Sequence, residues 1–522
     1  MITRLYSAAV SGIDGYEVTV EVDAHQVMDT GRISIVGLPD TAVRESIQRV
    51  TSALTNSHFF CPGEMVVTVN LAPADVKKQG PGFDLPIALG LQVTIQQNYK
   101  KMPEAFRRRI PLGLEDWCFI GELALDGKLR GVRGILPQAV AARDAGRKYL
   151  MVSKENAAEA AVVQGIAVYA VEDLSEAWAV LSARERFATV EPQPAADVAG
   201  DVPDFCDVKG QPYARRAMEI AAAGGHNVLM CGSPGSGKSM LASRLPGILP
   251  PLTQEESLES SKIHSVCGLL PRGAGLLHAR PFRSPHHTIS DVGLMGGGSA
   301  ITPGEISLAH NGVLFLDELP EFSRRTLETL RQPLESGEVT ISRASGSMNF
   351  PCRFMLVAAM NPCPCGYLGD PRHTCRCSPA EVVRYRRKIS GPLLDRFDMV
   401  LEVPPVDPAS LLSKPEGEPS EVIRARVLAA RERQLARYKG LPISSNSQLS
   451  GRLLARFCPL SEKQRNILLD AVQMFALSAR AFDRILRVTR TIADLAGRDE
   501  ITDNDLYEAI QFRQYETRLK GA

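Results

Sequence analysis

The sequence predicts an α/β fold for the middle of the chain, and three observations indicate it. An apolar strand runs through a glycine-rich loop into a helix in NVLMCGSPGSGKSML, residues 227–241. Four apolar residues, 313–316, end in two acidic residues, as is typical of a strand buried in a parallel sheet. A third apolar run, 353–361, ends in an asparagine. The carboxyl ends of such strands face the ligand, so a binding site is expected there.

Two changes of composition divide the chain, whose 522 residues are too many for one hydrophobic core. Residues 188–205 and 403–421 are rich in proline, which is typical of boundaries. The second stretch leads into the helical pattern EVIRARVLAARERQLARY. The expected divisions are a first domain at 1–185, a linker at 186–205, an α/β core at 206–404 and a helical lid at 405–522.

Composition and the N-terminus indicate a cytoplasmic protein with no membrane segment. The N-terminal residues lack a secretory signal, and no apolar run approaches the roughly 18 residues of a membrane span. The 11 cysteines should therefore be reduced unless a metal holds them. With 60 Lys+Arg against 59 Asp+Glu, the net charge is +1. Any binding to nucleic acid must therefore come from local basic surfaces.

The glycine-rich loop has the pattern of a phosphate-binding loop. Its backbone N–H groups would wrap phosphates, the lysine would reach the β and γ phosphates, and the serine after it would ligate Mg²⁺. The predicted nucleotide-binding residues are Gly232, Ser233, Pro234, Gly235, Ser236, Gly237, Lys238 and Ser239. The alternative, a chance glycine-rich turn, is disfavoured by the strand and helix on either side. ATP and Mg²⁺ are the cofactors that this pattern implies.

The polar residues that end the next two strands complete a predicted hydrolysis site. Asp317 would hold Mg²⁺, and Glu318 would polarise the attacking water. Asn361 would orient that water beside the γ-phosphate. Taken alone, the two acids could simply mark a strand meeting its surface loop, and Asn361 could start the turn that Asn-Pro favours. The phosphate loop makes ATP hydrolysis the preferred interpretation.

Several long motifs in the same order resemble the magnesium-chelatase-like AAA+ ATPases of the ComM/YifB group. They include DVKGQPYARRAMEIAAAGGHNVLMCGSPGSGKS, FRSPHHTISDVGLMGGGSAITPGEISLAHNGVLFLDELPEF, QPLESGEVTISRASGSMNFPCRFMLVAAMNPCPCG and GPLLDRFD, and the resemblance covers nearly the whole chain. It implies a ring, expected to be a homo-hexamer, with ATP between subunits. By position, Arg396 resembles the arginine finger that serves a neighbour's γ-phosphate, and Arg480 resembles the sensor-2 arginine of the lid. Without the resemblance, either arginine could belong to a solvated basic face.

Relatives of this group project two insertions into a central channel. Here the first corresponds to 290–305, whose glycines permit a flexible tip, and the second to the expected hairpin 338–350. In the hairpin Val339 and Ile341 alternate inward before the turn ASGS. Arg343 is a candidate DNA phosphate contact, although an ordinary strand-end arginine is an equal alternative.

Four cysteines gather directly after Asn361 in NPCPCGYLGDPRHTCRC. Cys363, Cys365, Cys375 and Cys377 have a spacing that suits tetrahedral Zn²⁺, and the loop has little apolar content to order it otherwise. The C-x-C spacing departs from the commoner C-x₂-C knuckle. A redox pair, free thiols, and His373 as a substitute ligand stay open as alternatives. Structural zinc beside the ATP site is the preferred prediction.

The N-terminal region resembles the proteolytic domain of Lon proteases in VNLAPADVKKQGPGFDLPIALGL and FIGELALDGKLRGVRGILPQAVAARDAGRKYLMVSKEN. The Lon family uses a Ser-Lys dyad, and the matching positions here are Gly82 and Leu136. Without a hydroxyl and an amine, the nucleophilic route is unavailable. The expected domain is therefore a degenerate Lon-like scaffold, assembly module or docking surface. Lys77 and Lys78 could touch DNA, but a solvated basic turn is the preferred interpretation.

Two functional classes follow from these motifs. The first is a helicase or translocase whose channel loops move along single-stranded or branched DNA. The group resemblance points to branch migration during recombination of incoming DNA in natural transformation, with recombination proteins as possible partners. The second is a chelatase-type motor that remodels a protein partner. A Lon-like ATP-dependent protease is disfavoured by the missing dyad. DNA is preferred, and the near-zero net charge leaves its binding surface unlocated.

Overall fold

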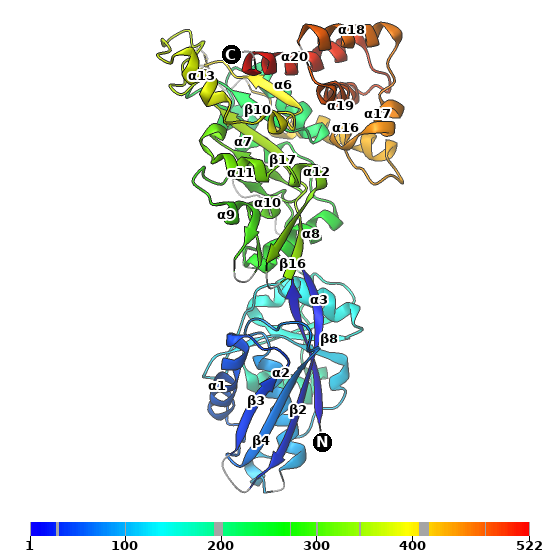
Figure 1. The fold of residues 1–522 in the computed structure, drawn as a ribbon. Helices are drawn as coiled ribbons and strands as arrows, with labels where there is room; N and C mark the ends of the chain where they lie inside the picture. Colours follow the sequence, from blue (N-terminus) through cyan, green and yellow to red (C-terminus); the bar gives the residue numbers. More distant parts are fainter. Residues whose placement is uncertain are drawn as a thin grey trace. The chain divides into compact units, whose positions relative to one another are not determined.

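The chain folds into two α/β units, and its path crosses between them more than once (Figure 1). In the computed structural model one unit comprises Met1–Val198 and Gln254–His278, and the other comprises Ala199–Thr253 and Ala279–Ala522. The structure describes residues 2–27, 31–99, 101–192, 202–271, 273–298, 301–343, 346–406, 417–475 and 477–520. The expected core at 206–404 thus contains a segment that packs with the N-terminal unit, and the domain division proposed from sequence stays a prediction.

A mixed seven-stranded sheet forms the centre of the N-terminal unit. Its strands are β1 (Thr3–Ser11), β2 (Asp14–Gln26), β3 (Arg32–Val36), β4 (Met65–Ala72), β5 (Trp117–Phe119), β8 (Tyr149–Ser153) and β9 (Ala167–Val171). The order is β3-β4-β2-β1-β5-β8-β9. β1, β2 and β4 pair antiparallel, whereas β5, β8 and β9 pair parallel. A short ladder joins β6 (Glu122–Leu123) to β7 (Leu129–Arg130).

Helices pack on this sheet and bury its apolar side chains. They are α1 (Thr41–Asn56), α2 (Asp84–Asn98), α3 (Ile135–Asp144), α4 (Ala157–Ala161), α5 (Leu174–Ser182) and α8 (Gln254–Cys267). Asp40 caps α1 by accepting a hydrogen bond from the Val43 N–H. Residues Asp84–Ile95 of α2 are all buried, so this helix lies in the core rather than at the surface.

Helix α8 belongs to the N-terminal unit although it follows the phosphate loop in sequence. The Ser265 carbonyl accepts a hydrogen bond from the Gly134 N–H at 3.0 Å, at the start of α3. The Ser265 hydroxyl accepts from the Leu136 N–H at 3.4 Å and donates to Glu159. Because these bonds satisfy the otherwise unpaired first N–H groups of α3, α8 completes that part of the unit.

The structure corrects the expected solvated turn at Lys77 and Lys78. Lys77 is exposed, but Lys78 is fully buried and its Nζ has no hydrogen-bond partner. Burial lowers the pKa of Lys78, because desolvation disfavours the ammonium form. The backbone explains the burial: the Lys78 N–H donates to the Leu38 carbonyl at 3.2 Å and its carbonyl accepts from Asp40 at 3.0 Å. This bridge turns the side chain inward, so Lys78 is not a DNA contact.

A five-stranded parallel sheet forms the centre of the second unit and confirms the three strands expected from sequence. Its strands are β10 (Val228–Cys231), β11 (Phe282–Arg283), β14 (Val313–Leu316), β17 (Met355–Met360) and β18 (Met399–Glu402), in the order β11-β14-β17-β10-β18. Every residue of β10, β14 and β17 is buried. Burial on both faces explains why these strands are continuously apolar rather than alternating.

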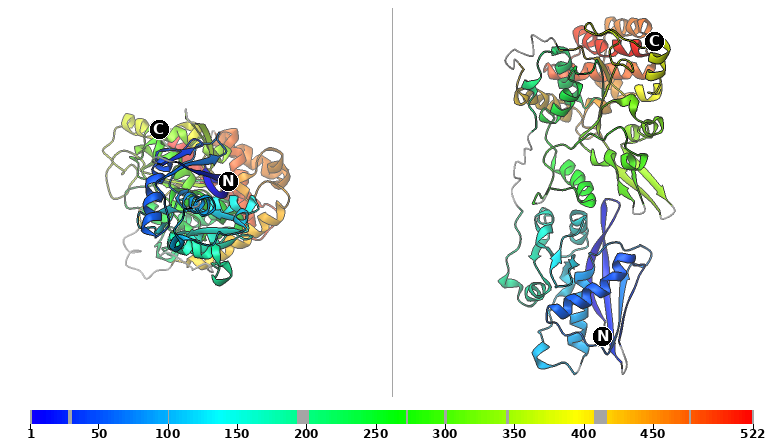
Figure 2. Two further views of the ribbon diagram at one scale, coloured as in Figure 1. Left: turned by 90° about the horizontal axis from the view of Figure 1, so that it is seen from below. Right: turned by 90° about the vertical axis from the view of Figure 1, so that its left-hand side faces the viewer.

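The remaining elements of this α/β part are short. The helices are α6 (Pro212–Gly224), α7 (Lys238–Arg244), α9 (Asp291–Met295), α10 (Glu305–Leu308), α11 (Arg324–Thr329), α12 (Pro333–Ser336), α13 (Pro379–Arg386) and α14 (Gly391–Leu394). The ladders are β12 (Gly296–Gly297) with β13 (Thr302–Pro303), and β15 (Glu338–Arg343) with β16 (Gly346–Pro351). The β15–β16 hairpin extends away from the five-stranded sheet (Figure 2).

Within described residues 417–475 and 477–520, the C-terminal part contains helices and no strand, as expected. Its helices are α16 (Ser420–Arg437), α17 (Gly451–Phe457), α18 (Glu462–Met474), α19 (Ala479–Leu495) and α20 (Asp503–Lys520), coloured orange to red in Figure 2. A buried carboxylate, Asp494, joins three of its segments. It accepts from Arg437 at 2.9 Å and Asn446 at 2.9 Å and lies 3.2 Å from Arg490. None of the helices described here has the length and apolarity needed to cross a bilayer.

Replacing Asp494 by alanine is expected to destabilise the helical part by about 3–5 kcal/mol, because two arginines would lose a buried counter-charge. Asp499→Ala is the matched control, since its side chain is 91% exposed and pairs with the partly exposed Arg433 at 3.2 Å. That control should cost less than about 1 kcal/mol. Denaturant unfolding followed by circular dichroism measures both. Equal midpoints for the two variants would contradict the role assigned to Asp494.

Candidate functional site

The phosphate loop lies between β10 and α7, as predicted. Gly237 has φ +88°, a left-handed conformation that favours glycine and starts α7. A Cβ on Gly232 would lie 2.2 Å from the Val403 carbonyl oxygen, so no larger side chain fits. The loop geometry therefore requires glycine at these two positions and leaves backbone N–H groups at the N-terminus of α7, where a phosphate binds favourably.

Lys238 is the first residue of α7, and its side chain folds back into the loop. Its Nζ donates to the Gly232 carbonyl at 2.8 Å and the Ser233 carbonyl at 2.9 Å, and lies 3.4 Å from the Asn361 amide oxygen. Burial lowers the pKa of Lys238, opposed by the nearby acidic groups. The structure thus places Lys238 and Asn361 together, in agreement with the expectation that the ends of these strands face one ligand.

The two predicted Mg²⁺ ligands, Ser239 and Asp317, also lie next to each other. The Ser239 hydroxyl donates to Asp317 Oδ2 at 2.6 Å, and the other Asp317 oxygen accepts from the Glu318 N–H at 2.9 Å. A hydroxyl and a carboxylate are oxygen donors of the kind that Mg²⁺ prefers. The donor set therefore fits Mg²⁺ beside a bound phosphate.

Glu318 has an unusual backbone and a partner that sequence reasoning missed. Its φ is +51°, and its carboxylate lies 3.3 Å from His287 Nδ1. His287 follows β11, which pairs with β14 in parallel register. Because only this strand pairing brings the two residues together, no spacing in the sequence indicated the contact. His287 can hold the Glu318 carboxylate by charge or hydrogen bond.

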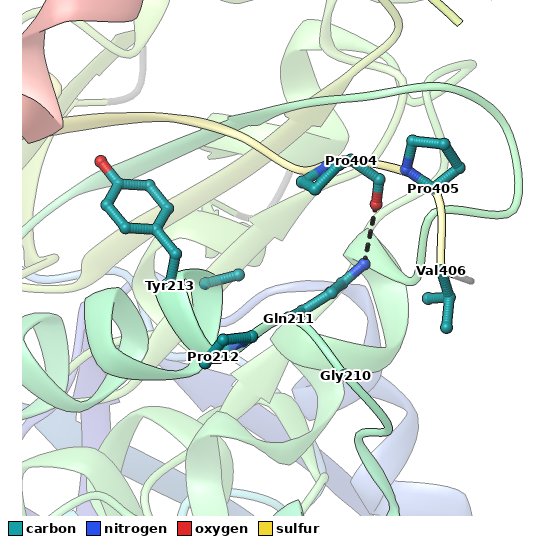
Figure 3. A pocket seen from close by; sticks show the side chains of 8 residues that line it. Gly210, Gln211, Pro212, Tyr213, Pro404, Pro405 and Val406 are labelled. Atoms are coloured by element: carbon teal, nitrogen blue, oxygen red, sulfur yellow. Dashed lines mark hydrogen bonds between the residues drawn. The ribbon is translucent and has the colours of Figure 1, made fainter. Parts of the chain in front are cut away.

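A pocket next to the phosphate loop was also not predicted. It has a volume of about 230 Å³ and is lined by residues 210–214 and 404–406. Gln211 crosses it, donating to the Pro404 carbonyl at 3.1 Å (Figure 3) and also to the Ser236 carbonyl of the phosphate loop. Tyr213 and the prolines supply flat apolar walls. Its chemistry suits a planar ring attached to the phosphates.

Arg396 and Arg480 lie together, but the structure does not bring them to the phosphate loop of the same chain. Arg396 is 8% exposed and forms an ion pair with Glu335. Burial lowers the pKa of Arg396, and the nearby positive charges of Arg480 and Arg331 lower it further. Arg480 is exposed near the start of α19. The two predicted arginines are thus neighbours, and Glu335 pairs with Arg396.

The two predicted channel insertions lie side by side. Val339 and Ile341 are buried on the β15–β16 hairpin, as the alternating pattern predicted, and Arg343 pairs with Gly346 at its exposed end. A Cβ on Gly297, in the first insertion, would lie 3.2 Å from Arg343 Nη2. Of the predicted segments, 299–300 and the turn residues 344–345 lie outside the described residues, as do 193–201 and 407–416 of the two boundaries.

The four cysteines form one cluster in the loop after Asn361. One ligand atom from each lies within 4.8 Å of the others, an arrangement that could hold a metal ion. Cys363 Sγ lies 3.4 Å from that of Cys365 and 3.7 Å from that of Cys375. His373 is not in the cluster, since its Nδ1 faces Asp370 at 3.4 Å. Four thiols at these separations are compatible with structural zinc.

The positions that match the Lon dyad carry no reactive group. A Cβ on Gly82 would touch only Ile120 and Val132, each at 3.8 Å. Leu136 is fully buried in α3. The neighbouring Asp84 is buried and bound by Arg49 at 2.7 Å, so its carboxylate serves the structure.

Comparison with known proteins decides the family. Models described as "Magnesium chelatase, subunit ChlI", "Subunit ChlI of Mg-chelatase" and "Magnesium chelatase, subunit ChlI C-terminal" match residues 204–411, 20–156 and 417–513. A YifB protein of Salmonella typhimurium is 42% identical over 99% of this chain and 97% of its own. The competence protein ComM of Haemophilus influenzae is 43% identical over 98% and 97%. The chain belongs to the ComM/YifB family of magnesium-chelatase-like AAA+ proteins.

A weaker similarity extends to a helicase. The DNA helicase MCM8 of Bos taurus is 25% identical over 207 residues, which are 39% of this chain and 21% of that protein. The AAA+ domain of the ComM/YifB family and this similarity both indicate an ATPase. The geometry of Lys238, Asp317, Glu318 and Asn361 agrees with that chemistry.

Glu318→Gln in this ComM/YifB protein is expected to lower ATP turnover by at least about 100-fold while ATP still binds, because the amide cannot polarise water. Glu321→Gln is the matched control, since Glu321 is three residues away and pairs with Lys388 at 3.4 Å. That variant should stay within about twofold of the wild type. Phosphate release and fluorescent-nucleotide titration measure turnover and binding. Unchanged turnover in Glu318→Gln would remove Glu318 from the chemistry.

Proposed function

We propose that this protein is an ATP-driven, ring-forming DNA motor that promotes branch migration during recombination of incoming DNA in natural transformation. The observation that carries the proposal is the pair of insertions in the ATPase unit, where Arg343 ends a hairpin beside the glycine loop at Gly297. The 43% identity to a competence protein supports the biological setting. The similarity to a DNA helicase supports the class of motor.

ATP would bind with its base in the pocket at Gln211 and its phosphates in the loop that Lys238 enters. Ser239 and Asp317 would hold Mg²⁺, which would neutralise charge on the phosphates. Glu318 would accept a hydrogen bond from the attacking water. Asn361 would orient that water at the γ-phosphate, a role supported by its distance of 3.4 Å from Lys238.

Completion of this site requires a second subunit. Arg396 pairs with Glu335 and has Arg480 and Arg331 near it, rather than the phosphate loop of its own chain. We therefore propose that each pair serves the nucleotide of a neighbour, Arg396 as the finger and Arg480 as the sensor, in a cytoplasmic homo-hexamer. Transfer of Arg396 from Glu335 to a phosphate would couple the state of one subunit to the next.

DNA contact is assigned to the hairpin. The net charge of +1 gives no general attraction to nucleic acid, so local cations must grip the phosphates. Arg343 is exposed at the end of the hairpin, next to the buried Gly297 of the first insertion. Recombination proteins are the partner class that branch migration would need.

A second candidate is a chelatase-type motor that remodels a protein partner. The description of the matching family models favours it. In both cases the N-terminal unit would not act as a protease, because Gly82 and Leu136 supply neither nucleophile nor base.

ATP turnover of the full-length protein should rise with single-stranded or branched DNA, and the rise should fade as salt increases, because phosphate contacts release counterions. Glu318→Gln serves as the inactive control. Turnover that ignores every DNA would reject the DNA motor and favour the protein-remodelling alternative.

Arg343→Ala should lose most of the DNA stimulation and keep basal turnover. Arg452→Ala, which removes another exposed arginine in α17, is the matched control and should behave as the wild type. Equal loss of basal and stimulated turnover in Arg343→Ala would place the defect in assembly instead of DNA contact.

We also infer that the cysteine cluster holds one structural Zn²⁺, since four thiolates are a common closed site for this metal. Elemental analysis of protein from metal-replete cells is expected to find about one zinc per chain. Cys206→Ser should retain the zinc, because Cys206 lies outside the cluster. A metal-free preparation would favour free thiols or a redox pair.

A further inference from the structure

The cysteine cluster does not stand apart from the nucleotide site. Its first ligand, Cys363, follows Asn361 by two residues, and Asn361 lies 3.4 Å from Lys238. Cys365 directly precedes Gly366, and the Cys365 N–H donates to Cys377 Sγ at 3.4 Å. Any ion that draws these thiols together therefore also fixes the backbone on both sides of them.

One contact from this loop reaches the phosphate loop through backbone. Gly366 has φ +87°, and a Cβ there would lie 2.7 Å from Cδ and Cγ of Pro234. The same Cβ would lie 3.9 Å from Cγ of Asn361. Gly366 thus packs against the outer side of the phosphate loop, with no space for a side chain between them.

A second contact is polar. The Asp370 carboxylate lies beside the Ser233 side chain, whose hydroxyl is the largest cause that lowers the pKa of Asp370 to about 2. The same carboxylate accepts from the N–H groups of Arg372 at 2.8 Å and His373 at 3.1 Å. The Asp370 side chain is only 2% exposed. Asp370 therefore joins the turn between the two pairs of cysteines to a residue of the phosphate loop.

We propose that the metal-bound cysteine loop, residues 363–377, is a brace of the ATP site that holds the phosphate loop through Gly366 and Asp370. Without metal, the four cysteines are joined by weak sulfur hydrogen bonds in place of metal–thiolate bonds. Gly366 and Asp370 are then free to leave Pro234 and Ser233, and the phosphate loop loses two supports on its outer side. Asp370 is a positioning residue: it acts on phosphate through Ser233. Zinc occupancy and ATP affinity are accordingly linked.

Linkage between two sites must be reciprocal. Loss of zinc should weaken ATP binding, and bound ATP should slow the loss of zinc. This inference rests on the proposed zinc site and on ATP binding, and it is independent of any DNA activity. A negative result in the DNA assays would therefore not contradict the zinc–ATP linkage. A negative result for the linkage would not contradict the proposed DNA activity.

The first experiment measures zinc release from full-length protein into a chromophoric chelator, with and without a slowly hydrolysed ATP analogue. The wild type should release zinc several-fold more slowly when the analogue is present. Lys238→Ala, in which the loop cation is gone, should show no such protection. Release at the same rate with and without the analogue in the wild type would overturn the linkage.

The second experiment measures ATP affinity by calorimetry in Asp370→Asn and Cys377→Ser. Asp370→Asn keeps every cysteine, so zinc should stay near one per chain while ATP binds about tenfold more weakly, the effect of losing one hydrogen bond to a charged group. Cys377→Ser should lose zinc and weaken ATP at least as much. Cys206→Ser is the control for the loss of a thiol.

The outcomes separate cleanly. Weaker ATP binding with retained zinc in Asp370→Asn supports the brace, even if Cys377→Ser fails to fold. Affinity within twofold of the wild type in Asp370→Asn rejects it, and so does zinc release from the wild type that the ATP analogue does not slow. Absence of zinc from metal-replete protein also rejects it, because the loop would then need no ion to hold its place.

Discussion

The parallel pairing of β10, β14 and β17 is the constraint on which the rest of the ATPase unit depends. Leu229 pairs with Ala358 and Phe315 with Val357, so the three strands end at the same edge of the sheet. That shared edge brings together the phosphate loop, Asp317 and Asn361, which are spread along residues 232–361 of the sequence. All side chains of these three strands are buried in the core, so backbone pairing and core packing together set their alignment. A shift of register in any of them would separate the lysine, the carboxylates and the amide.

Buried arginines of the helical part bind the segment just before β18 and so attach the helices to the sheet. The Phe397 carbonyl, just before β18, accepts hydrogen bonds from Arg484 of α19 and Arg513 of α20. Asp398, beside it, lies 3.5 Å from Arg484 and caps the Asn227 N–H at 3.1 Å at the start of β10. The segment that holds Arg396 is thus fixed from two sides. The segment is therefore joined to the start of β10, at the opposite end of that strand from the phosphate loop.

The sequence predicts this unit well where the signal is local. The phosphate loop, the apolar strands and the β15–β16 hairpin each occupy one continuous stretch, and the structure has them as expected. The predictions are weaker where a contact depends on which strands are neighbours. His287 meets Glu318 only because β11 lies beside β14, and Gln211 reaches the phosphate loop from the segment before α6. Lys78 shows the same limit, since a basic pair in a turn gives no sign that a backbone bridge buries one member.

Helix α8 makes the N-terminal unit discontinuous in sequence, because residues 254–278 follow the phosphate loop but belong to that unit. Leu258 and Leu276, on the stretch from 254 to 278, pack on the same apolar cluster as Leu136 and Leu150 of the N-terminal unit. A gene fragment that stops at the proline-rich linker would therefore encode an incomplete core with an exposed apolar face. The N-terminal unit is not a detachable module. Exchange of this unit between proteins in evolution would require two separate pieces of coding sequence to move together, which favours inheritance of the whole chain.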